Sequence, residues 1–265
     1  MADRYAVVGN PVAHSKSPQI HAEFARATGQ DLEYARLEAP LDGFESTVEA
    51  FRAQGGKGLN VTVPFKEAAF RYCRGLSPRA RVAGVANTLV LTGTEVFGDI
   101  TDGVGLVVDL TRNLGFDLRR KNLLLMGAGG AAQGVVQALL DAGVARLLIA
   151  NRTVSRAQAL AARHGVAACG YEELAGERFD VVVNATSAGL ANEAPKLPRS
   201  AFKSGTLAYE MVYGRDTPFL AQARAAGARA SDGLGMLVEQ AAESFLLWRG
   251  VRPDTRVVLE KLRGG

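Results

Sequence analysis

The segment that most restricts the fold is an apolar run followed at once by a glycine-rich turn. Leu123-Leu124-Leu125-Met126 leads into Gly127-Ala128-Gly129-Gly130-Ala131-Ala132, and apolar residues then recur with helical spacing to Leu140. The turn reads G-x-G-x-x-A, the pattern in which a strand turns tightly into a helix and backbone N–H groups can approach a pyrophosphate. A plain strand-to-helix turn can carry the same letters, so the motif alone leaves both interpretations open.

Short apolar runs alternate with helix-like segments along the chain, which is typical of an α/β protein. Residues 88–91 and 95–97 resemble a hairpin around Thr92-Gly93. A first helix is expected at Ser17-Pro18, with Ser17 as its cap and Pro18 in its first turn. Further helices are expected over 101–115, from the glycine turn onward, over 234–248 and up to 262. The expected strands are residues 5–8, 59–63, 122–126, 147–150, 179–183 and 207–211.

The composition excludes several classes of protein. With 48% hydrophobic and 22% charged residues, the 265-residue chain does not have the composition of a disordered protein. The net charge is only +4 and the basic residues are dispersed, so we expect no nucleic-acid partner. Cys73 and Cys169 lack metal-ligand spacing, so we expect no metal. The uncharged stretch 122–140 contains glutamines and glycines, so we expect no membrane span, and the absence of a signal-peptide pattern predicts a cytoplasmic protein.

The strand after the glycine turn ends in Asn151-Arg152-Thr153, with Arg156 one helical turn further on. Sites specific for NAD usually place a carboxylate here, on the ribose 2′-hydroxyl. This chain offers guanidinium groups instead, and these bind a 2′-phosphate through charge-assisted hydrogen bonds. The sequence therefore favours NADP over NAD.

Two further segments carry polar residues where ligands bind. Asn184-Ala185-Thr186 follows a buried strand, at the end where an open α/β sheet binds its ligands, although an ordinary loop is nearly as good an interpretation. Ser15 and Ser17 place two hydroxyls beside an expected helix N-terminus, which could trap an anion.

Asn60 and Thr62 share one face of an expected strand, and Lys66 follows just past its end. By itself Lys66 carries no special weight, and Asp102 is explained by spacing alone as a helix cap. His21 lies in the first expected helix and is best explained as packed or solvated.

Taken together and in this order, these motifs resemble the shikimate/quinate dehydrogenase family over nearly the whole chain. The most specific block is Asn60-Val61-Thr62-Val63-Pro64-Phe65-Lys66. The other matching segments are Ser15 to Pro18, Asn87-Thr88, Thr101-Asp102-Gly103, the glycine turn, Asn151-Arg152-Thr153, Asn184-Ala185-Thr186, and Asp232 to Leu237 with Gln240.

The resemblance implies two α/β domains. Residues 1–101 with 234–265 would form a substrate-binding domain to which the C-terminal helices return, and 102–233 a Rossmann-type NADP-binding domain. The implied reaction is the NADPH-dependent reduction of 3-dehydroshikimate to shikimate in aromatic amino acid biosynthesis. Members of such families are monomers or homodimers, and the sequence does not choose between these states.

The resemblance also implies roles for individual residues. Lys66 and Asp102 would form the catalytic pair in acid–base and orienting roles, and which of them moves the proton is left open. Hydride delivery to a ketone builds negative charge on oxygen, which needs such a proton donor or cation. The implied substrate contacts are Ser15, Ser17 and Tyr213 for the carboxylate, and Thr62, Asn87 and Gln240 for the ring hydroxyls, with Asn60 counted among them. The implied cofactor contacts are Gly127, Ala128, Gly129, Gly130, Ala131, Asn151, Arg152, Thr153, Arg156, Thr186, Met211 and Gly233.

Two alternatives stay open at this point. One is a broader quinate/shikimate dehydrogenase that uses NAD, against which Arg152 and Arg156 argue. The other is a non-catalytic dinucleotide-binding regulator, which would need neither Lys66 nor Asp102. The chain also carries Glu210 where the family more often has aspartate, so we expect a slightly altered loop there.

Overall fold

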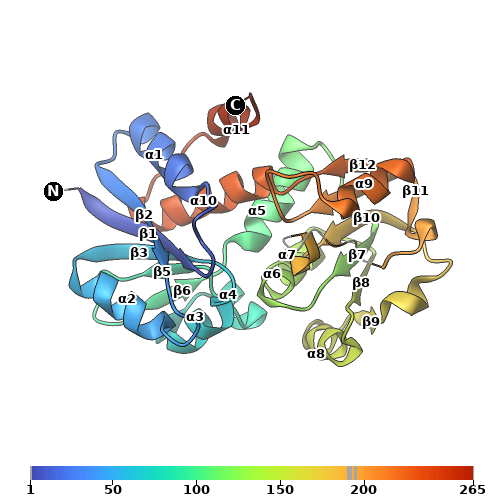
Figure 1. Ribbon diagram of the computed structural model, residues 1–265, viewed down its shortest axis with the longest axis horizontal. Helices are drawn as coiled ribbons and strands as arrows, with labels where there is room; N and C mark the ends of the chain where they lie inside the picture. Colours follow the sequence, from blue (N-terminus) through green and yellow to red (C-terminus); the bar gives the residue numbers. More distant parts are fainter. Residues whose placement is uncertain (1, 190–192, 194–195, 265) are drawn as a thin grey trace. The chain divides into compact units, whose positions relative to one another are not determined.

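The computed structural model describes residues 2–189, 193 and 196–264. The chain divides into two compact units, Met1–Gly105 with Leu237–Gly265, and Leu106–Met236. Both divisions fall inside helices, α5 (Asp102–Val108) and α10 (Leu234–Arg249), within a few residues of the boundaries expected at Thr101 and Gly233. Figure 1 shows the strands and helices of each unit.

The first unit is built on a six-stranded mixed sheet of order β2-β1-β3-β5-β6-β4. β1 pairs in parallel with β2 and β3, and the antiparallel hairpin β5–β6 continues the sheet. The strands are β1 (Asp3–Gly9), β2 (Leu32–Glu38), β3 (Gly56–Val61), β4 (Gly75–Leu76), β5 (Thr88–Val90) and β6 (Phe97–Asp99). The helices are α1 (Ser17–Thr28), α2 (Phe44–Ala53), α3 (Lys66–Tyr72), α4 (Pro78–Ala83), the start of α5, most of α10, and α11 (Thr255–Gly264).

Alternation along the strands divides this sheet into two faces of different character. Ala6, Val8, Leu59 and Val61 point toward α2 and α3 and form an apolar core with Phe44, Val48, Phe51 and Phe65. The register places Arg36, Val7, Asn60, Thr88 and Asp99 in one row on the opposite face. That face therefore carries the polar side chains.

The second unit is built on a six-stranded parallel sheet of order β12-β11-β10-β7-β8-β9. This is the doubly wound order of a Rossmann fold, and the strand order reverses between β7 and β10. Its strands are β7 (Asn122–Met126), β8 (Arg146–Ala150), β9 (Ala167–Cys169), β10 (Phe179–Asn184), β11 (Phe202–Glu210) and β12 (Arg229–Ser231). Its helices are the end of α5, α6 (Gly130–Gln133), α7 (Val136–Asp141), α8 (Val154–His164) and α9 (Pro218–Ala225), with a π-helical turn at Asp109–Asn113 and 3-10 turns at Tyr171–Leu174, Ser187–Gly189 and Arg199–Ala201.

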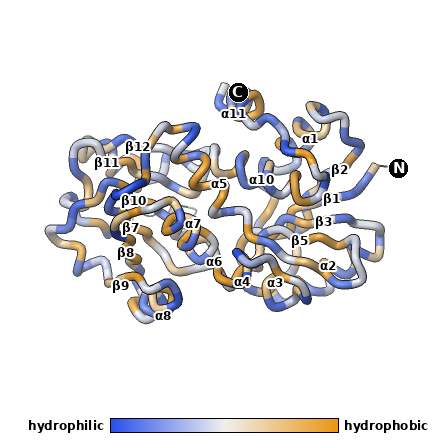
Figure 2. The backbone as a smooth tube through the Cα atoms, turned by 180° about the vertical axis from the view of Figure 1, so that it is seen from behind, coloured by the Kyte–Doolittle hydropathy of each residue, from blue (hydrophilic) through white to orange (hydrophobic). Residues whose placement is uncertain are grey.

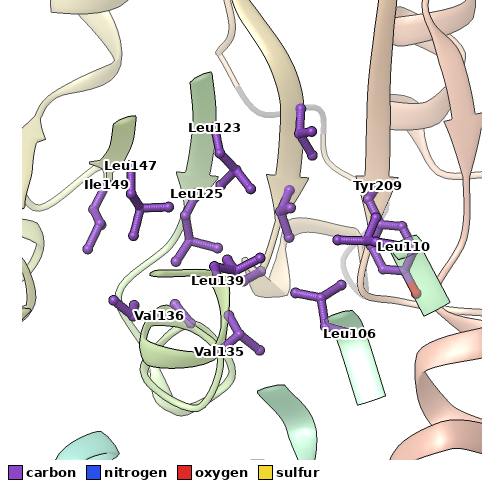
Figure 3. Packing of buried hydrophobic residues seen from close by; sticks show 14 of the residues in the cluster. Leu106, Leu110, Leu123, Leu125, Val135, Val136, Leu139, Leu147, Ile149 and Tyr209 are labelled. Carbon is purple, nitrogen blue, oxygen red and sulfur yellow. The ribbon is translucent and has the colours of Figure 1, made fainter. Parts of the chain in front are cut away.

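Helices cover both faces of this parallel sheet, which explains why its central strands are apolar throughout. Figure 3 shows Leu123, Leu125, Leu147 and Ile149 on the side of the sheet where Leu106 of α5 and Val136 and Leu139 of α7 pack. The alternate residues of the same strands pack against Phe219, Leu220 and Ala223 of α9. Figure 2 shows the resulting apolar stretches along β7, β8 and β10.

The predicted two-domain α/β fold is confirmed, with local differences from the expected elements. The cap of α1 is Lys16, because its carbonyl accepts the first intrahelical bond from the N–H of Ile20, and Ser17 is the first helical residue. The hairpin turn is wider than expected, so its second strand runs over Phe97–Asp99. The helix after the glycine turn is interrupted between α6 and α7, where the N–H of Val135 bonds the Ala132 carbonyl three residues back. The helix from Asp102 likewise gives way to a π-helical turn.

Candidate active site

Lys66 and Asp102 form a buried ion pair in the first unit. Nζ of Lys66 lies 2.5 Å from Oδ2 of Asp102, and the two side chains are 13% and 6% exposed. Each residue is the first of a helix: α3 begins at Lys66 and α5 begins at Asp102. A carboxylate is favourable at a helix N-terminus and a cation is not, so Asp102 compensates for the position of Lys66. Spacing alone predicts only a helix-capping role for Asp102, whereas the structure also pairs its carboxylate with Lys66.

Asn87 connects this ion pair to α10. Its amide nitrogen donates to Oδ1 of Asp102 at 2.9 Å and to Oε1 of Gln240 at 3.2 Å. Its amide oxygen accepts a 2.8 Å bond from the backbone N–H of Thr101. Gln240 also donates through Nε2 to the Leu237 carbonyl. Four of the predicted site residues, namely Lys66, Asn87, Asp102 and Gln240, are therefore joined by hydrogen bonds.

Asn60 belongs to the same network, but its side-chain amide already bonds other groups of the protein. Its oxygen accepts from the Tyr34 hydroxyl at 2.7 Å, and its nitrogen donates to Ser244 at 2.9 Å and to Thr88 at 3.2 Å. With these partners Asn60 is suited to holding its neighbours in place, and its predicted contact with substrate stays a prediction.

Three hydroxyls of this network were given no role by sequence reasoning. The hydroxyl of Ser244 lies within hydrogen-bond distance of those of Thr88 and Thr101, at 2.8 Å and 3.3 Å. Thr88 and Thr101 stand beside motif residues, and Ser244 follows Gln240 by one helical turn. That spacing is the signal in the sequence that could have identified Ser244.

Ser15 and Ser17 lie together at the start of α1. Both are buried, and the hydroxyl of Ser15 donates to that of Ser17 at 3.1 Å while accepting from the Ser17 backbone N–H at 3.2 Å. Two buried hydroxyls held side by side can donate to one anionic group. Thr62 follows β3 directly, and its backbone N–H donates to the Val8 carbonyl.

His21 is a packed residue in this unit. Its ring is fully buried and stacks on Tyr34 with centroids 4.2 Å apart. Burial lowers the pKa of His21 to about 3, so the ring is neutral at physiological pH. Of the two expected states for His21, packed or solvated, the structure shows the packed one.

The glycine turn lies in the second unit, between β7 and α6, at the point where the strand order reverses. Gly127 adopts a φ of +107°, and a Cβ there would lie 3.0 Å from the Ala185 carbonyl oxygen. Gly129 has ordinary backbone angles, and a Cβ on it would meet nothing within 4 Å. Gly127 thus serves the turn itself, whereas Gly129 leaves backbone open to a ligand. Ala128, Gly130 and Ala131 complete the turn.

Arg152 and Arg156 follow β8, and both are exposed. Asn151 shapes the turn, because its amide nitrogen donates to the Thr153 carbonyl at 2.9 Å, and Thr153 is the cap residue of α8. No acid occupies this strand end in the sequence. The open backbone at Gly129 and the exposed guanidinium groups fit a pyrophosphate and a 2′-phosphate.

A hydrogen-bonded chain lies at the carboxyl ends of β10 and β11. Asn184 accepts bonds from the N–H and hydroxyl of Thr186 at 3.1 and 2.7 Å, and donates to Glu210 at 2.8 Å. Glu210 also accepts from the Thr217 hydroxyl at 3.0 Å. Burial raises the pKa of Glu210 and these hydrogen bonds oppose the rise. No role is predicted for Asn184 from the sequence, although this residue directly follows a predicted strand and belongs to one of the matching motifs.

Met211 and Gly233 meet in the second unit, where a Cβ on Gly233 would lie 2.4 Å from the Met211 carbonyl oxygen. Tyr213 belongs to the same unit and is partly buried. The predicted cofactor residues are thus all in the second unit, and the predicted substrate residues other than Tyr213 are in the first.

The described residues contain neither a cluster of metal-ligating side chains nor a membrane-spanning helix. Over 2–189, 193 and 196–264 there is no group of three or more His, Cys, Asp or Glu side chains able to hold a metal ion. In the same residues no helix has the length and apolar character needed to cross a membrane.

Family models match three parts of the chain. Residues 7–89 match the shikimate dehydrogenase substrate binding domain, residues 109–196 match shikimate / quinate 5-dehydrogenase, and residues 233–263 match the shikimate 5'-dehydrogenase C-terminal domain. These matches follow the order in which the motifs occur.

Curated relatives and solved structures agree with these models. The chain is 58% identical to a shikimate dehydrogenase (NADP(+)) of Aromatoleum aromaticum, over 98% of this chain and 97% of the relative. It is also 58% identical to one of Halorhodospira halophila, over the full length of both. A crystal structure of shikimate 5-dehydrogenase from Thermus thermophilus, in complex with NADP(H) and shikimate, superposes with a TM-score of 0.89 at 36% identity, covering 99% of each chain. The chain therefore belongs to the shikimate dehydrogenase family.

Proposed function

We propose that this protein is an oxidoreductase that catalyses the reversible, NADPH-dependent reduction of 3-dehydroshikimate to shikimate. The observation that carries the proposal is the buried Lys66–Asp102 pair, joined through Asn87 to Gln240. Relatives at 58% identity bear the name shikimate dehydrogenase (NADP(+)). Its cytoplasmic location and its state as a monomer or homodimer stay predictions.

The reduction requires a hydride at the carbonyl carbon and a proton at the carbonyl oxygen. NADPH supplies the hydride when it is bound. Lys66 Nζ donates a hydrogen bond to Asp102 Oδ2 across 2.5 Å, and we place the carbonyl oxygen beside this pair. The ammonium stabilises negative charge as it develops on that oxygen, and the pair delivers the proton that makes it a hydroxyl. Which of the two residues passes the proton on is a question for variants of each.

The remaining polar groups of the first unit orient the ring. Ser17 donates its hydroxyl hydrogen to the substrate carboxylate, and Ser15 does the same by exchanging its bond to Ser17 for one to the carboxylate. We also propose Tyr213 as a contact of this carboxylate. Asn87, Gln240 and Thr62 bind the ring hydroxyls. The second N–H of the Gln240 amide can serve this purpose, since among the described residues Nε2 donates to one acceptor, the Leu237 carbonyl. We also propose Asn60 as a substrate contact, and its side chain holds Thr88 and Ser244 in place.

The second unit provides the cofactor site. Ala128, Gly129, Gly130 and Ala131 would lie along the pyrophosphate, beyond the turn that Gly127 makes. Arg152 and Arg156 would bind the 2′-phosphate, with Asn151 and Thr153 shaping that turn. Thr186, Met211 and Gly233 would line the nicotinamide end.

The identity of the product tests this proposal. The purified protein is incubated with 3-dehydroshikimate and NADPH, and the product is identified by chromatography and mass spectrometry. We expect shikimate in amounts equal to the NADPH consumed. NADPH consumption with a different ring product would contradict the substrate assignment. NADPH binding without consumption would instead indicate the dinucleotide-binding regulator.

A further inference from the structure

Arg36 contacts the loop that carries the two buried serines. Its Nε and one of its terminal nitrogens both donate to the backbone carbonyl of Ser15, at 2.9 and 2.6 Å. This is a fork of two hydrogen bonds from one guanidinium to one oxygen, a geometry that lysine cannot reproduce. The bonds span 21 residues of sequence, from β2 to the residue before the cap of α1.

The position of Arg36 on the sheet explains how it reaches this loop. Tyr34 and Arg36 stand two residues apart on β2, so their side chains lie on the same face. The Tyr34 hydroxyl bonds Asn60 on that face, while Arg36 bonds Ser15. The strand β2 therefore supports two parts of the proposed substrate site. One is the loop that carries Ser15 and Ser17, called the serine loop below, and the other is the network of buried hydrogen bonds around Asn60.

The serine loop depends on this contact for its orientation. The Ser15 hydroxyl bonds Ser17 and its N–H bonds the Val12 carbonyl. Because Arg36 also holds the backbone carbonyl of Ser15, the Ser15–Lys16 peptide has little freedom to rotate. The backbone that carries both hydroxyls is thus held in place before an anion arrives, which lowers the entropy lost on binding.

An arginine on an edge strand has a simpler explanation. β2 is the edge of its sheet, and charged residues there prevent the strand from pairing with another chain. That role requires only charge and exposure. It predicts no effect on substrate binding when Arg36 is replaced, and so the two explanations can be separated.

We infer that Arg36 is a positioning residue for the carboxylate of the substrate, acting through the Ser15 carbonyl. The inference rests on the proposed function, because Ser15 and Ser17 bind a carboxylate only if shikimate is the substrate. Arg36 touches no reacting atom in this account. It should therefore affect KM for shikimate far more than kcat.

Steady-state kinetics of two variants test the inference. Arg36→Gln removes the fork, and we expect KM for shikimate to rise roughly tenfold, with kcat changed less than about threefold. Arg36→Lys keeps the charge but can give only one hydrogen bond to the carbonyl, so its KM should lie in between. The methyl ester of shikimate lacks the charged carboxylate, so the preference for the acid over the ester should shrink in Arg36→Gln. Arg256→Gln is the control, because it removes an exposed arginine of α11 in the same unit.

The outcomes separate the inference from the proposed function. Unchanged KM and unchanged preference for the acid in Arg36→Gln, with an active parent protein, would overturn the inference alone. An inactive parent protein would overturn the proposed function and the inference together. If Arg36→Gln does not fold, judged by its melting temperature and NADPH affinity, then Arg36→Lys decides, and a KM equal to that of the parent would reject the inference.

Discussion

Lys66 Nζ lies 2.5 Å from Oδ2 of Asp102, and the other oxygen of the same carboxylate accepts a 2.9 Å hydrogen bond from Asn87. The carboxylate is thereby held on both oxygens by groups from different segments of the first unit. An ammonium kept this close to a buried carboxylate is oriented before substrate arrives. The account of the site rests on this arrangement.

Replacement of Lys66 by alanine should lower kcat about 10²-fold or more, because the reaction loses the cation and the proton held by the pair. KM for shikimate should change less, since Ser15, Ser17 and Asn87 stay in place. The measurement is steady-state kinetics, with NADPH affinity by fluorescence as the check that the second unit is intact.

The control for this variant is Lys261→Ala, which breaks an exposed ion pair with Glu23 in the same unit. It should leave kcat unchanged. A Lys66→Ala protein with full turnover would end the catalytic assignment of that residue. Asp102→Asn keeps the side-chain shape, and comparing its pH profile with that of the parent shows whether the carboxylate takes part in the proton transfer.

The double replacement Arg152→Ala with Arg156→Ala should raise KM for NADPH far more than KM for NADH. Only NADPH carries the 2′-phosphate that the two guanidinium groups are proposed to bind. Arg146→Ala is the matched control, since it removes an arginine of the same unit that pairs with Glu177. Equal changes for both cofactors would contradict the 2′-phosphate assignment.

The two glycines of the turn should respond differently to alanine. Gly127→Ala should lower the melting temperature, because φ is +107° and the new Cβ would lie 3.0 Å from a carbonyl oxygen. Gly129→Ala should leave the melting temperature unchanged, because no atom lies within 4 Å of the position that the new Cβ would take. It should nevertheless weaken NADPH binding roughly tenfold or more, because the methyl group occupies space that the pyrophosphate needs. Undiminished affinity in Gly129→Ala would place the pyrophosphate elsewhere.

Asp99 should make stability fall in acid. Burial would raise its pKa, but hydrogen bonds from Arg79 and Ser77 and the charge of Arg79 outweigh burial and hold the pKa below its usual 3.8. A carboxyl with a depressed folded-state pKa stabilises the protein above its unfolded pKa, and this contribution is lost as the pH falls through the folded value. The free energy of unfolding should therefore decline below about pH 4.

Asp99→Asn should remove much of that decline and cost roughly 2–4 kcal/mol at neutral pH, because it leaves the partly buried Arg79 without its main partner. Chemical denaturation across the pH range measures both effects. Asp117→Asn, which disrupts an exposed pair with Arg119, should change the curve little. A flat pH dependence in the parent protein would show that Asp99 has no depressed pKa.

Much of the fold could be predicted because its signals are local. The run 122–126 and the glycine turn specify a buried strand and its exit, and β7 spans Asn122–Met126. β2 was not predicted, since its pattern of burial alternates only weakly at the edge of the sheet. The break between α6 and α7 was also missed, because the apolar spacing continues through it.

The site could be predicted only through its motifs. Lys66 and Asp102 each have an ordinary local explanation, and their ion pair joins residues 36 apart in sequence. Of the supporting groups, Arg36 carries no sequence signal, Thr88 and Thr101 only stand beside motif residues, and Ser244 is marked only by its spacing from Gln240. Their partners are set by sheet register and by the return of α10 to the first unit. Such contacts are visible only in three dimensions.

Because the proposed reaction is reversible, the protein should oxidise shikimate with NADP⁺. The most direct measurement follows the absorbance of reduced nicotinamide with shikimate or quinate, each supplied with NADP⁺ or NAD⁺. The account predicts rapid reduction of NADP⁺ with shikimate and much slower reaction in the other three combinations. Equal or faster reaction with quinate and NAD⁺, or no reaction in any combination, would contradict it.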